Sequence, residues 1–146
     1  MTVSKAVLAD IPEIMTIERE SFSDPWTAEG FISEIDAPMS IFLAAHDQSG
    51  RVTGYIVGSC DGYLAYISNI AVAHTARRTG TGTLLLEAFK TVLPETAESI
   101  TLDVRVSNLP AIELYKKFGF KAAGIRKSFY THPAENAEVM IMNIGR

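Results

Sequence analysis

The fold is decided by the stretch Asn69-Ile70-Ala71-Val72-Ala73-His74-Thr75-Ala76-Arg77-Arg78-Thr79-Gly80-Thr81-Gly82-Thr83. Residues 69–72 end an apolar run typical of a β-strand, and a helical pattern follows over about 82–92. The N–H groups that open this helix face one point, which the helix dipole makes favourable for an anion. Glycines at that point let a ligand approach the backbone, and arginines precede them. The stretch therefore predicts a strand, an anion-binding loop and a helix, although a Gly-rich turn before a helix is also common.

Downstream of this unit, the apolar pattern predicts a strand over residues 100–106 and a helix over 110–118. Two further strands, over 120–130 and 137–144, are joined by residues 131–136. A strand, helix and strand in this order predict a right-handed crossover onto a parallel neighbour.

Upstream of the unit, apolar residues at helical spacing predict a first helix over about 10–22. Thr27 begins a second short helix that continues to about residue 35. Strands over 41–46, 52–59 and 63–72 then predict an antiparallel meander. The order of elements indicates an α+β protein with a mixed, largely antiparallel sheet, and a length of 146 residues indicates a single domain over residues 1–146.

The composition excludes several classes of protein. Hydrophobic residues make up 47% of the chain and charged residues 21%, which is typical of a globular rather than a disordered protein. A net charge of −4 argues against a surface that wraps nucleic acid. Cys60 is the only cysteine, and no apolar run approaches the ~18 residues that span a membrane. We expect a cytoplasmic protein that binds neither nucleic acid nor a membrane.

A second motif begins at Asn108 and continues through Ala111, Tyr115, Gly119 and Phe120 in the pattern N-x-x-A-x-x-x-Y-x-x-x-G-F. Together with the Arg77-x-x-Gly80-x-Gly82 pattern, it resembles the acetyl-CoA-binding segments of the GNAT superfamily of N-acetyltransferases. The resemblance implies a twisted, largely antiparallel sheet of about six to seven strands flanked by about four helices. It also implies acetyl-CoA as co-substrate, with no metal. The residues that it places on the cofactor are Ile70, Ala71, Val72, Arg77, Arg78, Thr79, Gly80, Thr81, Gly82, Thr83 and Asn108.

Tyr115 has two interpretations. By the resemblance, its hydroxyl protonates the departing CoA thiolate. By its spacing alone, Tyr115 belongs to an i, i+3, i+4, i+7 stripe with Ala111, Leu114 and Phe118, which is typical of residues that pack in a core. A buried tyrosine hydroxyl still needs a hydrogen-bond partner, which the edge of an active site supplies.

Asp103 is the candidate general base. Acetyl transfer requires an amine that loses a proton, directly or through water. Asp103 lies in the middle of an apolar strand, where an unpaired carboxylate is costly, and strand alternation places it on one face with Thr101 and Arg105. An ion pair between Asp103 and Arg105 is the structural alternative.

The resemblance extends to a subfamily, the ribosomal-protein-alanine (RimI-type) N-acetyltransferases. Its first-helix pattern I-E-x-x-x-F…P-W is matched by Ile17 to Phe22 followed by Pro25-Trp26, and its G-x-R-x-x-Y-Y strand is matched by Gly124 to Tyr130, except that Phe129 replaces a tyrosine. The resemblance implies that Glu18, Trp26 and Tyr130 contact the acceptor. It also implies the N-terminal alanine of ribosomal protein S18 as that acceptor, whose α-amine has a pKa near about 8.

The general base departs from the subfamily pattern, since glutamate is usual where this chain has Asp103. The shorter side chain loses a bit over ~1 Å of reach. A bridging water, Glu18, Glu138 or a backbone carbonyl could supply the missing function.

Three functions are therefore compatible with the sequence. The first is a monomeric acetyltransferase for a protein N-terminus, with direct attack by the amine in a ternary complex. The second is a GNAT enzyme that acts on a lysine side chain or a small-molecule amine. The third is an acyl-CoA-binding sensor without turnover, against which the presence of both Asn108 and Tyr115 argues.

Overall fold

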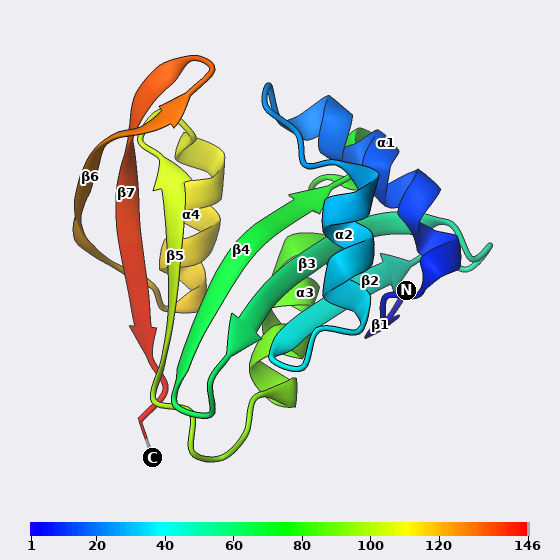
Figure 1. Cartoon of the computed structure of the whole chain (residues 1–146), viewed down its shortest axis with the longest axis horizontal. Helices are drawn as coiled ribbons and strands as arrows, with labels where there is room; N and C mark the ends of the chain where they lie inside the picture. The colour runs from blue at the N-terminus through cyan, green and yellow to red at the C-terminus, as the bar shows by residue number, and fades with distance from the viewer. Residues whose placement is uncertain (146) are drawn as a thin grey trace.

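The computed structural model describes residues 1–145, and within them seven strands form one sheet (Figure 1). The order across the sheet is β1-β2-β3-β4-β5-β7-β6. All neighbours are antiparallel except β4 and β5, which are parallel and are connected through α3. The strands are β1 (Thr2–Lys5), β2 (Ser40–His46), β3 (Val52–Cys60), β4 (Leu64–Val72), β5 (Ser99–Arg105), β6 (Lys121–Thr131) and β7 (Ala134–Asn143).

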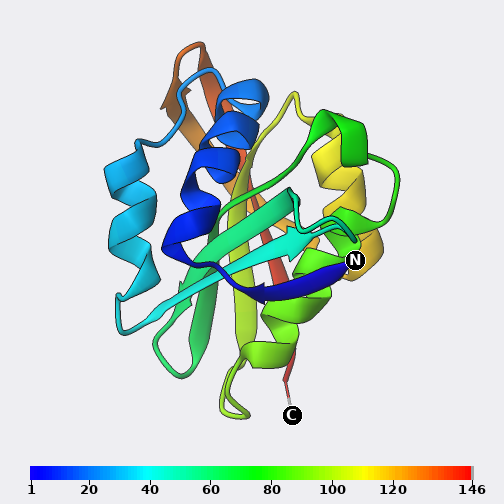
Figure 2. The same ribbon diagram turned by 90° about the vertical axis from the view of Figure 1, so that its right-hand side faces the viewer.

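The helices cover the two faces of this sheet (Figures 1 and 2). On one face lie α1 (Ile11–Ser21) and α2 (Ala28–Ile35), and on the other lie α3 (Thr81–Val92) and α4 (Leu109–Phe118). Short 3-10 turns precede two of them, η1 (Leu8–Asp10) before α1 and η2 (His74–Ala76) before the loop that leads to α3.

Strand alternation divides the interior into two cores. On β2, Leu43 and Ala45 face α3 and α4, whereas Phe42 and Ala44 face α1 and α2. By the same alternation, Ile56 of β3 faces the core under α3 and α4. Side chains on successive strand residues point to opposite faces, so one strand can serve both cores. The sheet is therefore buried on both faces in its middle.

Local sequence signals explain where the helices begin and end. The Thr27 hydroxyl accepts a hydrogen bond from the N–H of Gly30 at 3.1 Å, which caps α2. The Asn108 side chain caps α4 in the same way through the N–H of Ala111. Gly119, with φ of 122°, ends α4 in a conformation that favours glycine.

The observed architecture confirms the predicted α+β class, the meander of β2 to β4 and the parallel pairing around α3. Two details differ from the prediction. Strand β1 was not predicted, because it has four residues, most of them exposed, and lies at the edge of the sheet beside β2. The turn between β6 and β7 is tighter than the predicted segment 131–136, since the ladder continues to the pair Thr131 and Ala134.

Candidate functional site

The loop that leads into α3 leaves a row of backbone N–H groups without partners. Among the residues that the structure describes, none accepts a hydrogen bond from the N–H groups of residues 78–83. They lie at the N-terminus of a 12-residue helix, where the helix dipole is positive. Arg77 and Arg78 are exposed beside them. This end of α3 fits a phosphate or pyrophosphate group, because it offers both donors and positive charge.

The two glycines of this loop have different functions. Gly80 has φ of 84°, and a side chain added there would meet nothing within 4 Å. It therefore provides a left-handed turn and open space for an approaching ligand. A Cβ on Gly82 would instead lie 2.9 Å from Cδ2 of Leu114, so Gly82 allows α3 and α4 to pack closely.

Strands β4 and β5 separate beside this helix. They pair only from Leu64 with Ser99 to Ile67 with Leu102, although both strands continue beyond that point. A bulge in β4 at Ser68 coincides with the end of pairing, because Gly58 of β3 lies opposite Ile67 while Val57 lies opposite Asn69. Figure 1 shows the two strands diverging toward the N-terminal end of α4.

The divergence leaves one edge of β4 unpaired over its last residues. Ile70, Ala71 and Val72 bond to β3 on one side and have no β5 partner on the other. An extended ligand arm can bond to such an edge as an added strand does. The three residues thus lie in a suitable place for an extended part of the cofactor that the GNAT resemblance implies there.

Asp103 lies on β5 just beyond the last pair with β4. Only 4% of its side chain is exposed. Its carboxylate accepts a hydrogen bond from the Tyr66 hydroxyl of β4 and another from Nε of Arg126 at 2.9 Å. The ion pair with Arg105, which was the alternative to a functional role, is not formed; Arg126 provides the positive charge instead.

Tyr115 and Tyr130 are the two tyrosines that the sequence assigned to the site. Burial, together with the field of Tyr130, raises the pKa of Tyr115 well above its usual range. Burial and the charge of Asp103 likewise raise the pKa of Tyr130. The Tyr130 ring contacts the guanidinium of Arg105, whereas Tyr115 packs in the core under α3 and α4. At neutral pH both hydroxyls are protonated and can donate a proton.

The oxygen and the nitrogen of the Asn108 side-chain amide have different environments. Its Oδ1 accepts the 3.3 Å hydrogen bond that caps α4, and the residue is exposed. Its Nδ2 donates to none of the residues 1–145. This amide group is therefore available to a ligand while the oxygen holds the helix.

Glu18 is buried, with 1% of its surface exposed. Its carboxylate accepts hydrogen bonds from the backbone N–H of Trp26 at 2.9 Å, the hydroxyl of Tyr55, and Nδ2 of Asn69 at 2.8 Å. Burial raises the pKa of Glu18 despite these donors. The Trp26 ring packs against Phe31 with centroids 5.0 Å apart. Glu18 thus joins α1, the α1–α2 loop, β3 and the bulged part of β4.

The structure assembles most of the predicted site residues at one end of the sheet. Asp103 projects from the face of β5 opposite the core that contains Leu102, Val104 and Tyr115, so the sheet lies between Asp103 and Tyr115. The α3 loop follows the free edge of β4. Glu18 bonds to Trp26, Tyr55 and Asn69 instead, because its oxygens point inward.

Two side chains of the site were not singled out by the sequence. Tyr66 and Arg126 both hold Asp103. Arg126 is the arginine of the Gly124 to Tyr130 motif, and this motif was the one feature of the sequence that could have indicated its role. Tyr66 could be placed only through the β4–β5 register, where it pairs with Thr101, two residues before Asp103.

Within residues 1–145, neither a metal cluster nor a membrane-spanning helix is found. No three histidine, cysteine, aspartate or glutamate side chains lie close enough together to hold a metal ion. No helix in this part of the chain has the length and apolar character needed to cross a membrane.

Comparison with known proteins gives a consistent result. The model of a family described as the acetyltransferase (GNAT) family matches residues 11–120. A Bacillus subtilis (strain 168) protein, named provisionally as a ribosomal protein bS18-alanine N-acetyltransferase, is 37% identical over 144 residues, which cover 94% of this chain and 92% of that protein. An N-alpha-acetyltransferase of Sulfurisphaera tokodaii is 32% identical over 152 residues, which cover 94% of this chain and 90% of that protein.

A solved structure agrees with these relatives. The crystal structure of the ribosomal-protein-S18-alanine N-acetyltransferase from Escherichia coli is similar with a TM-score of 0.85 at 29% identity. The match covers 99% of this chain and 94% of that chain. The chain therefore resembles these proteins in fold and sequence over nearly its whole length.

Proposed function

Because this chain belongs to the GNAT family of acetyltransferases, we propose that it transfers the acetyl group of acetyl-CoA to the α-amino group of a protein N-terminus. The observation that carries the proposal is the nearly buried Asp103, which the Tyr66 hydroxyl and Arg126 hold beside the point where β4 and β5 separate. The names of the relatives favour an N-terminal alanine, that of ribosomal protein S18, as the acceptor. Such a reaction belongs in the cytoplasm, and we expect a monomeric single domain to perform it.

The α3 loop would hold the phosphates of the cofactor. The unpaired N–H groups of residues 78–83 donate to the pyrophosphate, and Arg77 and Arg78 add positive charge. The free edge of β4 over residues 70–72 and Nδ2 of Asn108 bond to the arm. When bound, acetyl-CoA supplies the acetyl thioester that the amine attacks.

Asp103 would accept the proton that the amine loses as the new C–N bond forms. An α-amine has a pKa of about 8, so a carboxylate is a sufficient base near neutrality. Each carboxylate oxygen has two lone pairs, so Tyr66 and Arg126 leave room for a further donor. The amine bonds to Asp103 directly or through one water.

Tyr115 would complete the transfer as the acid. Its hydroxyl donates a proton to the sulfur as the C–S bond breaks, and the phenolate regains a proton from solvent. The raised pKa of Tyr115 keeps this hydroxyl protonated at neutral pH.

Glu18 and Trp26 would act on the acceptor through the loop that they stabilise. Glu18 fixes the backbone of Trp26 and the side chain of Asn69, so it orders both the α1–α2 loop and the bulge of β4. Tyr130, half-buried beside Arg105, would line the path of the peptide.

A thiol-release assay with matched peptides tests this function. One peptide begins with alanine and contains an internal lysine, and the second is the same peptide with a blocked N-terminus. We expect thiol release with the first peptide alone. Equal rates with both peptides would refute an N-terminal acceptor in favour of the lysine, and CoA binding without turnover of any amine would favour a sensor.

A further inference from the structure

We propose that Arg105 is a positioning residue for the acceptor, because its guanidinium fixes the β6–β7 turn against the α1–α2 loop and holds the ring of Tyr130. The inference rests on the proposed function, since it assigns these two segments to the acceptor side of the site. It concerns a residue that the sequence predicted only as a partner of Asp103.

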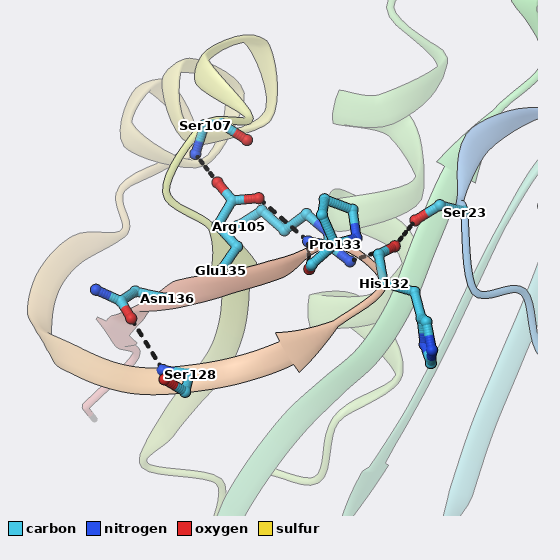
Figure 3. A network of polar contacts seen from close by, with 8 residues as sticks. All are labelled: Ser23, Arg105, Ser107, Ser128, His132, Pro133, Glu135 and Asn136. Carbon is cyan, nitrogen blue, oxygen red and sulfur yellow. Dashed lines mark hydrogen bonds and ion pairs between the residues drawn. The ribbon is translucent and has the colours of Figure 1, made fainter.

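Arg105 is the last residue of β5, and its guanidinium contacts several groups of the β6–β7 hairpin (Figure 3). Its Nη1 donates to the carbonyl of Pro133 at 2.9 Å and to Oε1 of Glu135 at 3.1 Å. Its Nη2 lies 3.4 Å from the carbonyl of His132. Oε2 of Glu135 accepts in turn from the N–H of Ser107 at 2.8 Å. The β6–β7 turn is thereby tied to both ends of the β5–α4 connection.

The same carbonyl of His132 links the turn to a segment far away in sequence. It accepts a hydrogen bond from the hydroxyl of Ser23 in the α1–α2 loop (Figure 3). Nδ1 of His132 also lies 3.6 Å from Oδ2 of the exposed Asp24. Figures 1 and 2 both show the tip of the β6–β7 hairpin beside this loop. Arg105 and Ser23 thus meet at one acceptor atom.

Arg105 also contacts the proposed substrate tyrosine. Its guanidinium carbon lies 4.3 Å from the centroid of the Tyr130 ring, in a cation–π contact. A single side chain therefore orients both the Tyr130 ring and the β6–β7 turn.

The identity of the residue is important for this arrangement. Four contacts in different directions require a planar group with several donors, which arginine has and lysine lacks. The Arg105 side chain is 22% exposed and pairs with Glu135, so lysine can retain the charge without being buried unpaired. We therefore expect Arg105→Lys to keep the fold and the positive charge but to lose the planar set of hydrogen-bond donors.

The test compares Arg105→Lys and Ser23→Ala with the wild-type enzyme and with Arg51→Lys, an exposed arginine in the β2–β3 turn, as the matched control. We expect the KM for an alanine-terminated peptide to rise about tenfold in both variants, as the loss of charged or well-placed hydrogen bonds produces. The KM for acetyl-CoA and the thermal midpoint should remain near those of the control.

Trp26, the only tryptophan, gives a readout that does not depend on turnover. Acrylamide should quench its fluorescence more strongly in both variants, because the α1–α2 loop loses its attachment to the turn. An unchanged peptide KM with unchanged quenching would overturn the inference. Equal increases of both KM values would also overturn it, since Arg105 would then only maintain the fold.

Failure of the proposed function gives a different result. A wild-type enzyme that does not acetylate the free N-terminus refutes that function and with it the acceptor role of Arg105. The quenching experiment would then still decide whether Arg105 fixes the two segments.

Discussion

At the scale of single residues, the site depends on a carboxylate in an environment that is unfavourable for a charge. Asp103 is 4% exposed, and Arg126 and Tyr66 compensate for its burial. The same groups hold the carboxylate in one orientation beside the last β4–β5 pair. An aspartate fixed in this way is the base that we propose.

Replacement of Asp103 by asparagine tests its role as the base. Without a base the reaction needs an amine that is already neutral, and the fraction of neutral α-amine rises as the pH passes through its pKa of about 8. We expect Asp103→Asn to lower the rate about 100-fold near neutrality, and less above the pKa of the amine. A ratio of wild-type to variant rates that is constant across the pH profile would contradict this role.

Replacement of Tyr115 by phenylalanine tests the acid and keeps the ring that packs against Phe120. We expect kcat to fall about 100-fold, with little change in the affinity for CoA, because the lost hydroxyl acts only when the thiolate leaves. Tyr63→Phe, at a 59% exposed tyrosine in the β3–β4 turn, is the matched control. A large loss of CoA binding in Tyr115→Phe would show a structural role instead.

The sequence could predict the place of a residue in the fold where that place depends on a single helix or strand. The helix pattern places Tyr115 and Asn108 on α4, and the glycines place the loop before α3. The sequence could not identify the true partner of Asp103. Arg126 is 23 residues away and reaches Asp103 because β6 pairs with β7 and β7 pairs with β5. Contacts across a sheet depend on register, which a local pattern does not determine.

At the scale of elements, the bulge in β4 is the feature that opens the site. Strand β4 pairs with β3 along its whole length and leaves β5 after Ile67. Gly58 lies opposite this point, and a Cβ there would overlap the backbone carbonyl of Tyr66 and lie 2.8 Å from the Phe89 ring. Glycine is needed here because of this close approach.

Gly58→Ala should therefore destabilise the protein and displace Tyr66. We expect a loss of about 3 kcal/mol in the free energy of unfolding, as overpacking against backbone produces. Gly124→Ala in β6, where a Cβ meets nothing within 4 Å, should change it by less than about 0.5 kcal/mol. Urea titration measures both, and equal stability of the two variants would contradict the role of Gly58.

The four helices and strands β2 to β7 were predictable from their periodic patterns, and β1 was not. Helices α1 to α4 and strands β2 to β5 begin or end within a few residues of their predicted limits. The bulge was not predicted, because it depends on the pairing of β3 with β4 rather than on either sequence alone. The separation of β4 from β5, which forms the site, is consequently visible only in three dimensions.

At the scale of the whole molecule, Glu18 connects the parts that border the site. Burial raises its pKa above the ordinary value of 4.5, although Trp26, Tyr55 and Asn69 donate hydrogen bonds to it. The folded protein therefore binds this proton more tightly than the unfolded chain does. The contribution of Glu18 to the free energy of unfolding is greatest at low pH and decreases as the pH rises from 4.5 through the folded pKa.

Glu18→Gln should remove this pH dependence. In urea titrations over a pH series, we expect the stability of the wild-type protein to decrease relative to the variant as the pH rises above 4.5. Glu95→Gln, at an exposed position between α3 and β5, should show no such difference and serves as the control. A constant difference between wild-type and Glu18→Gln across the series would contradict a raised pKa.

The central claim, transfer of acetyl to an α-amine, is tested most directly by locating the product acetyl group. The enzyme is incubated with acetyl-CoA and a peptide that begins with alanine and contains an internal lysine, and tandem mass spectrometry locates the modification. We expect a single acetyl group on the α-nitrogen of alanine. An acetyl group on the lysine Nζ, with the α-amine unmodified, would contradict this claim.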